Sequence, residues 1–223
     1  MLHGYCVRLA GQPGPSGVAG VGGAAVELLE SDRLGIWFSR VEVEPASLTR
    51  LRDHEVVVRT ALLSATPLPL RFGSVFSDEA ELTAFLHGGD GLLEKFTRIG
   101  NRVEMGCRVS SIAAKSNAGQ KSSGASPASG RAYLEGKREA MQLAASERES
   151  AAAILEEIER DLADIEAEVV REVDTSEGSI GSMAHLLRRR DVTLYRSRLL
   201  GTQQRRPDLR ITATGPWAPY SFV

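Results

Sequence analysis

The sequence predicts an α+β fold in which helices cover one face of a mainly antiparallel sheet. Within residues 1–112, strand-like runs with two-residue alternation and helix-like runs with three- or four-residue spacing follow one another in the order β-β-β-α-β-α-α-β. A long stretch of small and polar residues then interrupts the chain, and a second set of helices and strands follows it. These observations predict two α+β segments joined by a linker.

The first elements are expected to be a strand, a loop and a hairpin. Residues 2–9 (LHGYCVRL) alternate roughly and predict a strand, whereas six glycines and two prolines at 11–23 predict a loop. Two apolar runs within 24–44 predict a β-hairpin, with Ile36 and Phe38 directed inward.

A helix is expected next, from about residue 45 to residue 66. Ser47 can cap its start, and Pro67 ends it because the residue before a proline avoids the α conformation. The positions predicted to form its apolar face are Leu48, Leu51, Val58, Leu62 and Ala65. The segment LPLRFGSVF at 68–76 is expected to be a short edge strand.

Two short helices and a strand complete the first half. Asp78 and Glu81 have the spacing of a capping box, at the start of a helix that ends near residue 87. A second helix is expected at 91–99, and alternating apolar residues at 102–112 predict a strand.

The second half opens with a helical pattern at 133–173. The apolar residues that recur at steps of three or four are Ile154, Ile158, Leu162, Ile165, Val169 and Val173. Because forty helical residues would span about 60 Å, either a break near 144–151 or a hairpin-like excursion is expected. The helix either packs on a core or projects as a coiled-coil arm, since its apolar stripe is narrow. The remaining pattern predicts a strand at 182–187, a helix at 191–203 and a strand at 208–215.

The composition between the two halves indicates a domain boundary. Residues 113–131 are nearly all small or polar and cannot bury a core. We therefore expect a first domain at 1–112, a flexible linker or loop at 113–131, and a second domain at 132–223.

The overall composition argues against several classes of protein. The 223 residues are 42% hydrophobic and 25% charged with a formal net charge of −2, which does not favour a nucleic-acid binder. Cys6 and Cys107 have no metal-ligand spacing, so neither a disulfide framework nor a metal site is expected. No apolar run approaches the roughly 18 residues of a membrane span, and no secretory signal is recognisable. The sequence predicts a cytoplasmic protein that is not bound to a membrane.

A search for catalytic patterns gives little support for an enzyme. No GxSxG, HExxH or GxxxxGK[ST] motif is present, and no cofactor is expected. GVGGAA at 20–25 fits a dinucleotide-binding pattern but does not directly follow a strand. His54 and Glu55 could include a general base, yet adjacent helical residues point about 100° apart, which favours a buried, hydrogen-bonded histidine.

Arg71-Phe72-Gly73 places an arginine, an aromatic residue and a glycine side by side, in a segment bounded by prolines and glycine. Gly73 allows a positive φ or a close backbone approach. Arg71 carries a fork of donors, which suits either a structural clamp inside the domain or direct contact with a partner.

The C-terminal tail is the second segment in which distinctive residues cluster. Its prolines favour an extended segment, and it places three aromatic residues within six positions. Trp217, Pro219 and Tyr220 therefore either fasten the tail to the fold or offer anchors to a partner protein.

PLPLRFGSVFSDEAEL (67–82) and TGPWAPYSFV (214–223) resemble the two signature regions of the gas vesicle F/L family (GvpF/GvpL). HGYCV near the start, His54-Glu55, GNRVEMGCRV and GRAYLEGKR match further family features in order along the chain. The tail departs from the usual family pattern at Ala218, where a second proline is more common. The resemblance covers nearly the whole sequence.

The resemblance implies an N-terminal ferredoxin-like α/β sandwich, a C-terminal α+β domain with long helices, and no enzymatic activity. It also implies a minor component of gas vesicles, located with them in the cytoplasm. Such a component is expected to bind the hydrophobic shell protein and other accessory proteins during nucleation, with no nucleic acid, membrane or small-molecule substrate as partner.

Two hypotheses follow for the functional surface. In the first, shell binding uses the N-terminal domain, through the apolar hairpin at 34–43 and the Arg71-Phe72-Gly73 segment. In the second, His54, Glu55 and Arg71 line the pocket of a ligand-sensing or catalytic ferredoxin-like module, because such folds host many functions.

Overall fold

The computed structural model describes residues 1–42, 45–88, 90–112 and 130–223, which form two compact units. The first unit comprises Met1–Glu104, Leu186–Arg189 and Pro216–Val223, and the second comprises Met105–His185 and Arg190–Gly215. The predicted α+β class is confirmed. The predicted domain limits stay a prediction, because residues 113–129 of the expected linker lie outside the described residues.

The first unit is built on a sheet of five strands with the order β2-β3-β1-β4, in which β5 also pairs with β1. Its elements are β1 (Leu2–Leu9), β2 (Glu27–Ser31), β3 (Leu34–Arg40), α1 (Leu48–Ser64), β4 (Leu68–Pro69), β5 (Val75–Phe76), α2 (Glu79–His87) and α3 (Asp90–Ile99). Strand β1 is antiparallel to β3, β4 and β5. The predicted strand and hairpin at the start of the chain are confirmed.

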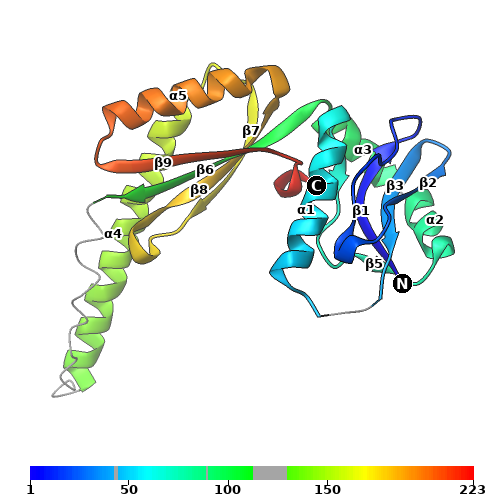
Figure 1. Ribbon diagram of the computed structural model, residues 1–223. Coiled ribbons are helices and arrows are strands. Elements are labelled where there is room, and N and C mark those ends of the chain that lie inside the picture. The colour runs from blue at the N-terminus through cyan, green and yellow to red at the C-terminus, as the bar shows by residue number, and fades with distance from the viewer. Residues whose placement is uncertain (43–44, 89, 113–129) are drawn as a thin grey trace. The chain divides into compact units, whose positions relative to one another are not determined.

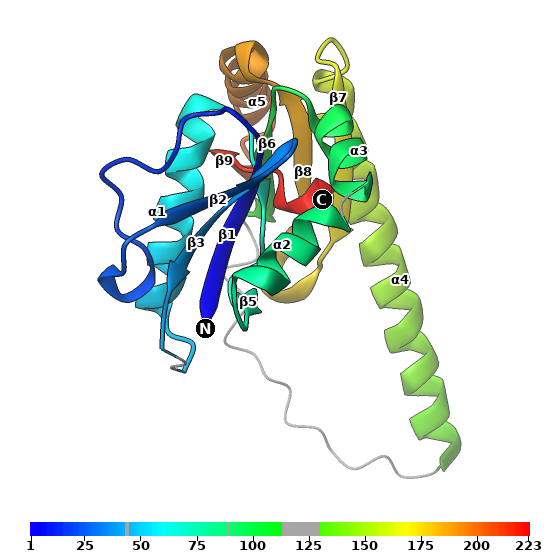
Figure 2. The same ribbon diagram turned by 90° about the vertical axis from the view of Figure 1, so that its right-hand side faces the viewer.

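Helices α1 and α2 cover opposite faces of this sheet (Figures 1 and 2). On β3, Trp37 packs with residues of α1 in one core cluster. Alternation turns Phe38 and Arg40 to the other face, where Arg40 forms an ion pair with Glu79 of α2. The expectation of helices on one face is therefore wrong here. The reason is that seven of the eight residues of β1 are buried, so both faces of the central strand need cover.

Helix α1 has the predicted cap but a different buried face. The Ser47 side chain accepts a hydrogen bond from the backbone N–H of Arg50. Leu48 and Leu51, which were expected to be buried, are 73% and 43% exposed. The residues that α1 buries are His54, Val57, Val58, Ala61 and Leu62. This set also has helical spacing, and it turns a histidine into the core.

The segments around α2 agree with the sequence in part. The predicted cap is confirmed, since Asp78 accepts from the Glu81 backbone N–H at 2.9 Å. The reciprocal bond of a capping box is shifted by one residue, because the Glu81 carboxylate accepts from the backbone N–H of Ser77, and not of Asp78, at 2.6 Å. The single strand expected at 68–76 is instead two short strands separated by a turn.

The second unit contains a four-stranded sheet with the order β7-β8-β6-β9. Its elements are β6 (Arg102–Ser111), α4 (Gly130–Asp161), β7 (Ala167–Val173), β8 (Ser179–Arg188), α5 (Val192–Arg205) and β9 (Leu209–Trp217), and the ends of β6, β8 and β9 belong to the first unit. The chain also has short 3-10 helices at Val21–Gly23, Ser176–Gly178, Arg189–Asp191 and Tyr220–Phe222. On β6, Met105, Cys107 and Val109 are buried, whereas the alternate residues are exposed or half-buried. The core of this unit therefore lies on one face of its sheet.

The long helix differs from its prediction in two respects. Helix α4 runs without the expected break from residue 130 to residue 161, and the segment Ala167–Val173 is strand β7. Val169 and Val173 misled the helical pattern because a step of four residues also keeps side chains on one face of a strand. None of the described helices is both long and apolar enough to span a membrane.

The two halves of α4 have different environments. Leu155 and Ile158 are fully or almost fully buried, whereas Leu134 and Met141 are 62% and 66% exposed. The N-terminal half extends past the end of the sheet of its own unit (Figure 1). Packing and projection, the two alternatives for this helix, thus apply to different halves of it.

Candidate functional site

The Arg71-Phe72-Gly73 segment forms a tight turn that is fastened to β1. Gly73 adopts a φ of 92°, as the sequence predicts for a glycine at this position. The carbonyl of Arg71 accepts hydrogen bonds from the backbone N–H and hydroxyl of Ser74, at 3.0 and 2.8 Å. The Ser74 carbonyl in turn accepts from the backbone N–H of Gly4 at 2.9 Å. The turn is therefore held in a single position on the first unit.

The two side chains of Arg71 and Phe72 have different environments. Arg71 is exposed, and within the described part of the chain its guanidinium has no hydrogen bond or ion pair. Phe72 is half-buried, with its ring centroid 5.6 Å from that of His3 and 5.8 Å from that of His54. The turn thus presents an arginine outward and packs an aromatic ring against two histidines.

A β-bulge in β1 turns neighbouring residues toward the same face of the sheet, beneath α1. His3 lies opposite Ser39 and Cys6 lies opposite Trp37, with a register shift between Gly4 and Cys6. Because Tyr5 is the extra residue, His3, Tyr5 and Cys6 all face the side of α1. In a regular strand, Cys6 would face the opposite side to the other two.

The two histidines form a directed hydrogen-bond chain. The Nε2 of His54 lies 3.0 Å from the Leu70 carbonyl oxygen, which can only accept, so Nε2 carries the proton. The neutral ring then offers Nδ1 as an acceptor, and the Nε2–H of His3 donates to it at 2.9 Å. The pKa of each imidazole is lowered to about 4, mainly by burial, and for His3 also by His54 and Arg50. Near neutral pH both rings are therefore uncharged.

Tyr5 lies beside these histidines and forms a hydrogen bond with the glycine-rich loop. Its hydroxyl donates to Ser39 Oγ at 2.9 Å and accepts from the Val21 backbone N–H at 2.8 Å. Burial raises the pKa of Tyr5. A Cβ atom on Gly20 would overlap both the Tyr5 and Ser39 hydroxyl oxygens, so only glycine allows this approach. The first glycine of the GVGGAA string thus allows contact with a tyrosine, in a loop that follows no strand directly.

The C-terminal tail docks on the first unit. Ala218 is 1% exposed and belongs to the core cluster that contains Tyr5, Trp37 and the buried valines of α1. Phe222 is 4% exposed. The short helix at the chain end, red in Figure 1, places the Tyr220 hydroxyl 3.3 Å from the Glu55 carboxylate, to which it donates. The tail therefore completes a core made mostly by residues more than one hundred positions earlier.

Polar contacts fix the tail on each side. The backbone N–H and hydroxyl of Ser221 donate to the two Glu104 carboxylate oxygens at 2.8 and 2.9 Å. Arg98 donates to the Phe222 carbonyl at 3.5 Å. Burial raises the pKa of Glu55 and of Tyr220. The tail was expected either to fasten to the fold or to offer anchors to a partner, and in the structure it is fastened to the fold.

The remaining predicted site residues lie in the interior or close to it. Ile36 and Phe38 are 0% and 2% exposed. They lie on β3, an inner strand of the sheet, so the hairpin does not offer the exposed apolar edge that was expected. Trp217 is half-buried and Pro219 is buried.

His54, Glu55 and Arg71 have different surroundings in the structure. His54 contacts His3 and Leu70, Glu55 accepts from Tyr220, and Arg71 faces outward. This separation gives no support to a shared pocket for the three side chains. Among the described residues no cluster of three or more His, Cys, Asp or Glu side chains could hold a metal ion.

Arg8 is a buried residue that the sequence did not indicate. It is 2% exposed, and its guanidinium lies 4.8 Å from the centre of the Trp37 ring. It donates to Ser64 Oγ at 3.0 Å, to Gln12 Oε1 at 3.3 Å and to the Pro13 carbonyl. The guanidinium thus ties the loop to α1 through neutral acceptors and an aromatic face.

Comparison with known proteins gives consistent matches. The model of the family "Gas vesicle synthesis protein GvpL/GvpF" matches residues 2–223. "Gas vesicle protein L" from Streptomyces sp. (strain CB03234) is 28% identical over 233 aligned positions, which cover 94% of this chain and 87% of that protein.

Two solved structures share the fold. The crystal structure of gas vesicle protein GvpF from Anabaena sp. PCC7120 is 21% identical with a TM-score of 0.79, and the match covers 99% of this chain and 94% of that one. The crystal structure of GvpF from Microcystis aeruginosa is 20% identical with a TM-score of 0.76, covering 99% and 98% of the two chains.

Proposed function

The chain belongs to the GvpL/GvpF family of gas vesicle synthesis proteins, and from that membership we propose that it acts as an accessory protein in gas vesicle assembly. In this proposal it binds subunits of the hydrophobic shell protein, and other accessory proteins, while the vesicle nucleates. The observation that carries the proposal is the family match, which extends from residue 2 to residue 223 and so includes both structural units.

The outer face of α1 is the surface of the first unit best suited to an apolar partner. Leu48, Val56 and Leu63 are 73%, 51% and 82% exposed. They lie eight and seven residues apart, which keeps them within about 80° of one another around the helix, so they form one stripe. This stripe takes the place of the hairpin at 34–43, whose Ile36 and Phe38 side chains are buried.

The physical task would be to cover apolar surface on shell subunits before they polymerise. Exposed apolar surface and unpaired strand edges promote aggregation, so a protein that covers them keeps subunits available for ordered growth. Arg52 and Arg59 are exposed between the three apolar residues. They would keep the unbound stripe hydrated and could pair with acidic groups at the rim of a contact. The role needs no catalytic step.

Co-purification of the full chain with the shell protein tests this proposal. The triple substitution Leu48→Ser, Val56→Ser, Leu63→Ser should remove most of the retained shell protein, because it removes the apolar stripe without touching buried residues. The matched control is Leu143→Ser, Leu194→Ser, Leu200→Ser, which changes three leucines of the second unit that are 62%, 40% and 60% exposed. This control should retain the shell protein.

Two outcomes separate the function from its surface. If the unmodified chain retains no shell protein, the binding function is wrong. If both triple variants retain it equally, binding stands and its assignment to α1 is wrong.

A further inference from the structure

One face of the second unit's sheet is polar and lies opposite its core. On β6, Cys107 and Val109 are 2% and 0% exposed, whereas Arg108 between them is exposed. On β9, Leu209 is 2% exposed and Arg210 is exposed. Alternation along a strand therefore places the two arginines on the face turned away from the buried residues.

The strand register brings serines next to these charges. The backbone N–H of Ile112 donates to the Asp208 carbonyl, and a Cβ on Gly106 would meet Thr214. Both strands advance by six residues between these points, in opposite directions (112 − 106 and 214 − 208), so Ser110 lies opposite Arg210. Arg108 is then the diagonal neighbour of Arg210 on the same face.

A shallow groove of about 550 Å³ crosses this face, and its size falls within the range of ligand-binding pockets. Arg108, Ser110, Ser182 and Arg210 line it, together with Glu172 and Asp174 at the β7 side. The Asp174 carboxylate already accepts from the backbone N–H and the hydroxyl of Ser176, at 3.0 and 2.6 Å. Glu172 is exposed.

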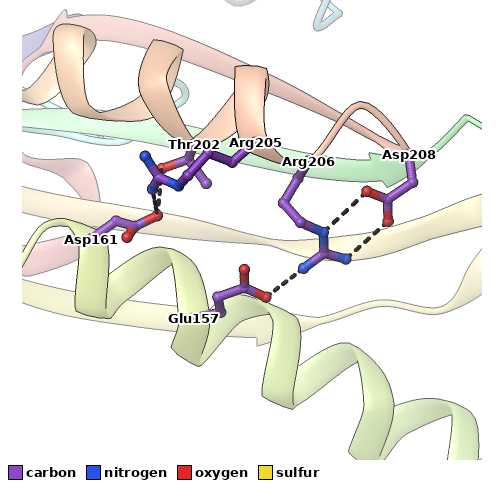
Figure 3. Close-up of polar contacts among 6 residues, drawn as sticks. All are labelled: Glu157, Asp161, Thr202, Arg205, Arg206 and Asp208. Carbon is purple, nitrogen blue, oxygen red and sulfur yellow. Dashed lines mark hydrogen bonds and ion pairs between the residues drawn. The ribbon is translucent and has the colours of Figure 1, made fainter.

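The arginine pair lacks the partners that neighbouring arginines have. Figure 3 shows Arg205 bonded to Asp161 and Arg206 bonded to both Glu157 and Asp208. Within the described residues, Arg108 and Arg210 form no ion pair or hydrogen bond through their guanidinium groups. Two like charges on adjacent strands repel each other, and an anion placed between them would relieve that repulsion.

We propose that this groove binds a carboxylate-bearing peptide segment of a partner protein. The guanidinium groups of Arg108 and Arg210 would donate to an acidic side chain, and the hydroxyls of Ser110 and Ser182 add neutral donors. Glu172 repels a ligand that is anionic along its whole length. The groove therefore favours a segment with its acidic residue over the arginines and a neutral or basic residue beside Glu172.

This inference is independent of shell binding by α1, because it concerns only residues of the second unit. A partner held here by charge would remain bound when the α1 stripe is replaced by serine. The two surfaces can therefore be tested one at a time.

Fluorescence anisotropy at low salt with a labelled Glu-Glu-Ser-Ser-Ser-Ser peptide, which is acidic at one end and neutral at the other, provides the test. The full chain should bind the peptide, and Arg108→Gln with Arg210→Gln should weaken binding at least tenfold. Glu172→Gln should strengthen it. The control, Arg138→Gln with Arg148→Gln, changes the net charge equally at exposed positions of α4 and should bind as the unmodified chain does. Circular dichroism checks that each variant is folded.

Three results would overturn the inference. The first is an absence of binding of this peptide to the unmodified chain at low salt. The second is equal weakening by the two double arginine variants, which would mean that only net charge matters. The third is competition in which inorganic phosphate binds the arginine pair at least as tightly as the peptide, since that would assign the groove to a small anion.

Discussion

Two polar networks, one in each unit, stabilise the protein by opposite chemistry. Beneath α1, His3 and His54 form a buried chain of uncharged groups that ends on the Leu70 carbonyl. Between α4 and α5, ion pairs join Arg205 to Asp161 and Arg206 to Glu157, with side chains that are 25% to 60% exposed (Figure 3).

The difference between the networks determines how each responds to change. A buried donor or acceptor that loses its partner costs about 1–3 kcal/mol, because no water replaces the lost bond. An exposed ion pair contributes about 0–1 kcal/mol, because water and salt replace it easily. The histidine network should therefore be sensitive to substitution and pH, and the arginine network mainly to salt.

The C-terminal tail closes the core that contains the histidine network, so its removal should have the largest effect. Deleting residues 216–223 removes the buried Ala218 and Phe222 side chains and should lower the free energy of unfolding by more than about 4 kcal/mol. Because this deletion can prevent folding, Phe222→Ala is the second variant, with an expected loss of about 3 kcal/mol. Urea unfolding measures both.

A thiol gives the tail experiment a local reporter. Cys6 is fully buried and belongs to the same core cluster as Ala218. In Phe222→Ala, Cys6 should react faster with a thiol reagent than in the unmodified chain. Cys107, in the core of the second unit, should keep its rate. Equal acceleration at both cysteines would indicate global unfolding and would contradict a local role for the tail.

Acid should destabilise the protein through the buried histidines. Burial lowers the pKa of His3 and of His54 from 6.5 to about 4. The unfolded chain therefore binds more protons between these two pH values. Stability is full above pH 6.5 and falls as the pH drops toward 4, by about 2 kcal/mol per histidine between pH 7 and pH 5. His185 adds a similar share, since burial also lowers its pKa to about 4.

Urea unfolding between pH 7 and pH 5 measures this slope. His87→Gln is the control, since the His87 side chain is exposed, and it should keep the slope of the unmodified chain. His3→Leu with His54→Leu should flatten it. An unchanged slope in that double variant would mean that other groups cause the acid sensitivity.

His54→Leu should lower the free energy of unfolding at pH 7 by about 3 kcal/mol, because it leaves the His3 N–H and the Leu70 carbonyl unpaired. Adding His3→Leu removes one of these unpaired groups. The double variant should therefore lose less than the sum of the two single variants. Additive losses would contradict the direct bond between the rings.

The sequence predicted most of the elements that local rules determine. The capping residues Ser47 and Asp78 and the positive φ of Gly73 each depend on a few neighbouring residues, and all are confirmed. Positions 54, 57, 58, 61 and 62 also have the spacing of a buried helical face, so the burial of His54 left a signal in the sequence. The sequence analysis accordingly favoured a buried, hydrogen-bonded His54, which is confirmed, but it placed Leu48 and Leu51 on the buried face, where the structure has Val57 and Ala61.

Features that depend on distant residues were not predictable from local patterns. His3 and His54 are 51 positions apart. Nothing in either segment indicates that a β-bulge at Tyr5 turns the residues His3 and Cys6 toward the same helix, α1. The docking of the tail on the first unit joins Tyr220 to Glu55 across 165 positions. Distinctive residues cluster in Arg71-Phe72-Gly73 and in the tail, so the sequence indicated that both segments matter. The residues they contact follow only from the fold.

The smallest effect is expected in the arginine network. Arg206 pairs with Asp208 through two nitrogens at 3.0 and 2.9 Å, and with Glu157. The Arg206 side chain is 25% exposed and its partners are 41% and 59% exposed, so Arg206→Gln should lower the free energy of unfolding by about 0.5–1 kcal/mol. Because salt screens exposed charges, the difference should disappear in 1 M NaCl, where the Debye length is about 3 Å.

Urea unfolding at low and high salt measures this difference, with Arg190→Gln as the control. The Arg190 side chain is 73% exposed and lies 3.8 Å from Asp191, so its replacement should change stability very little at either salt concentration. A loss above about 2 kcal/mol for Arg206→Gln that persists in high salt would place this arginine with the buried histidines, as a group whose partners water cannot replace. The contrast between the two networks would then be one of degree, determined by burial alone and not by charge.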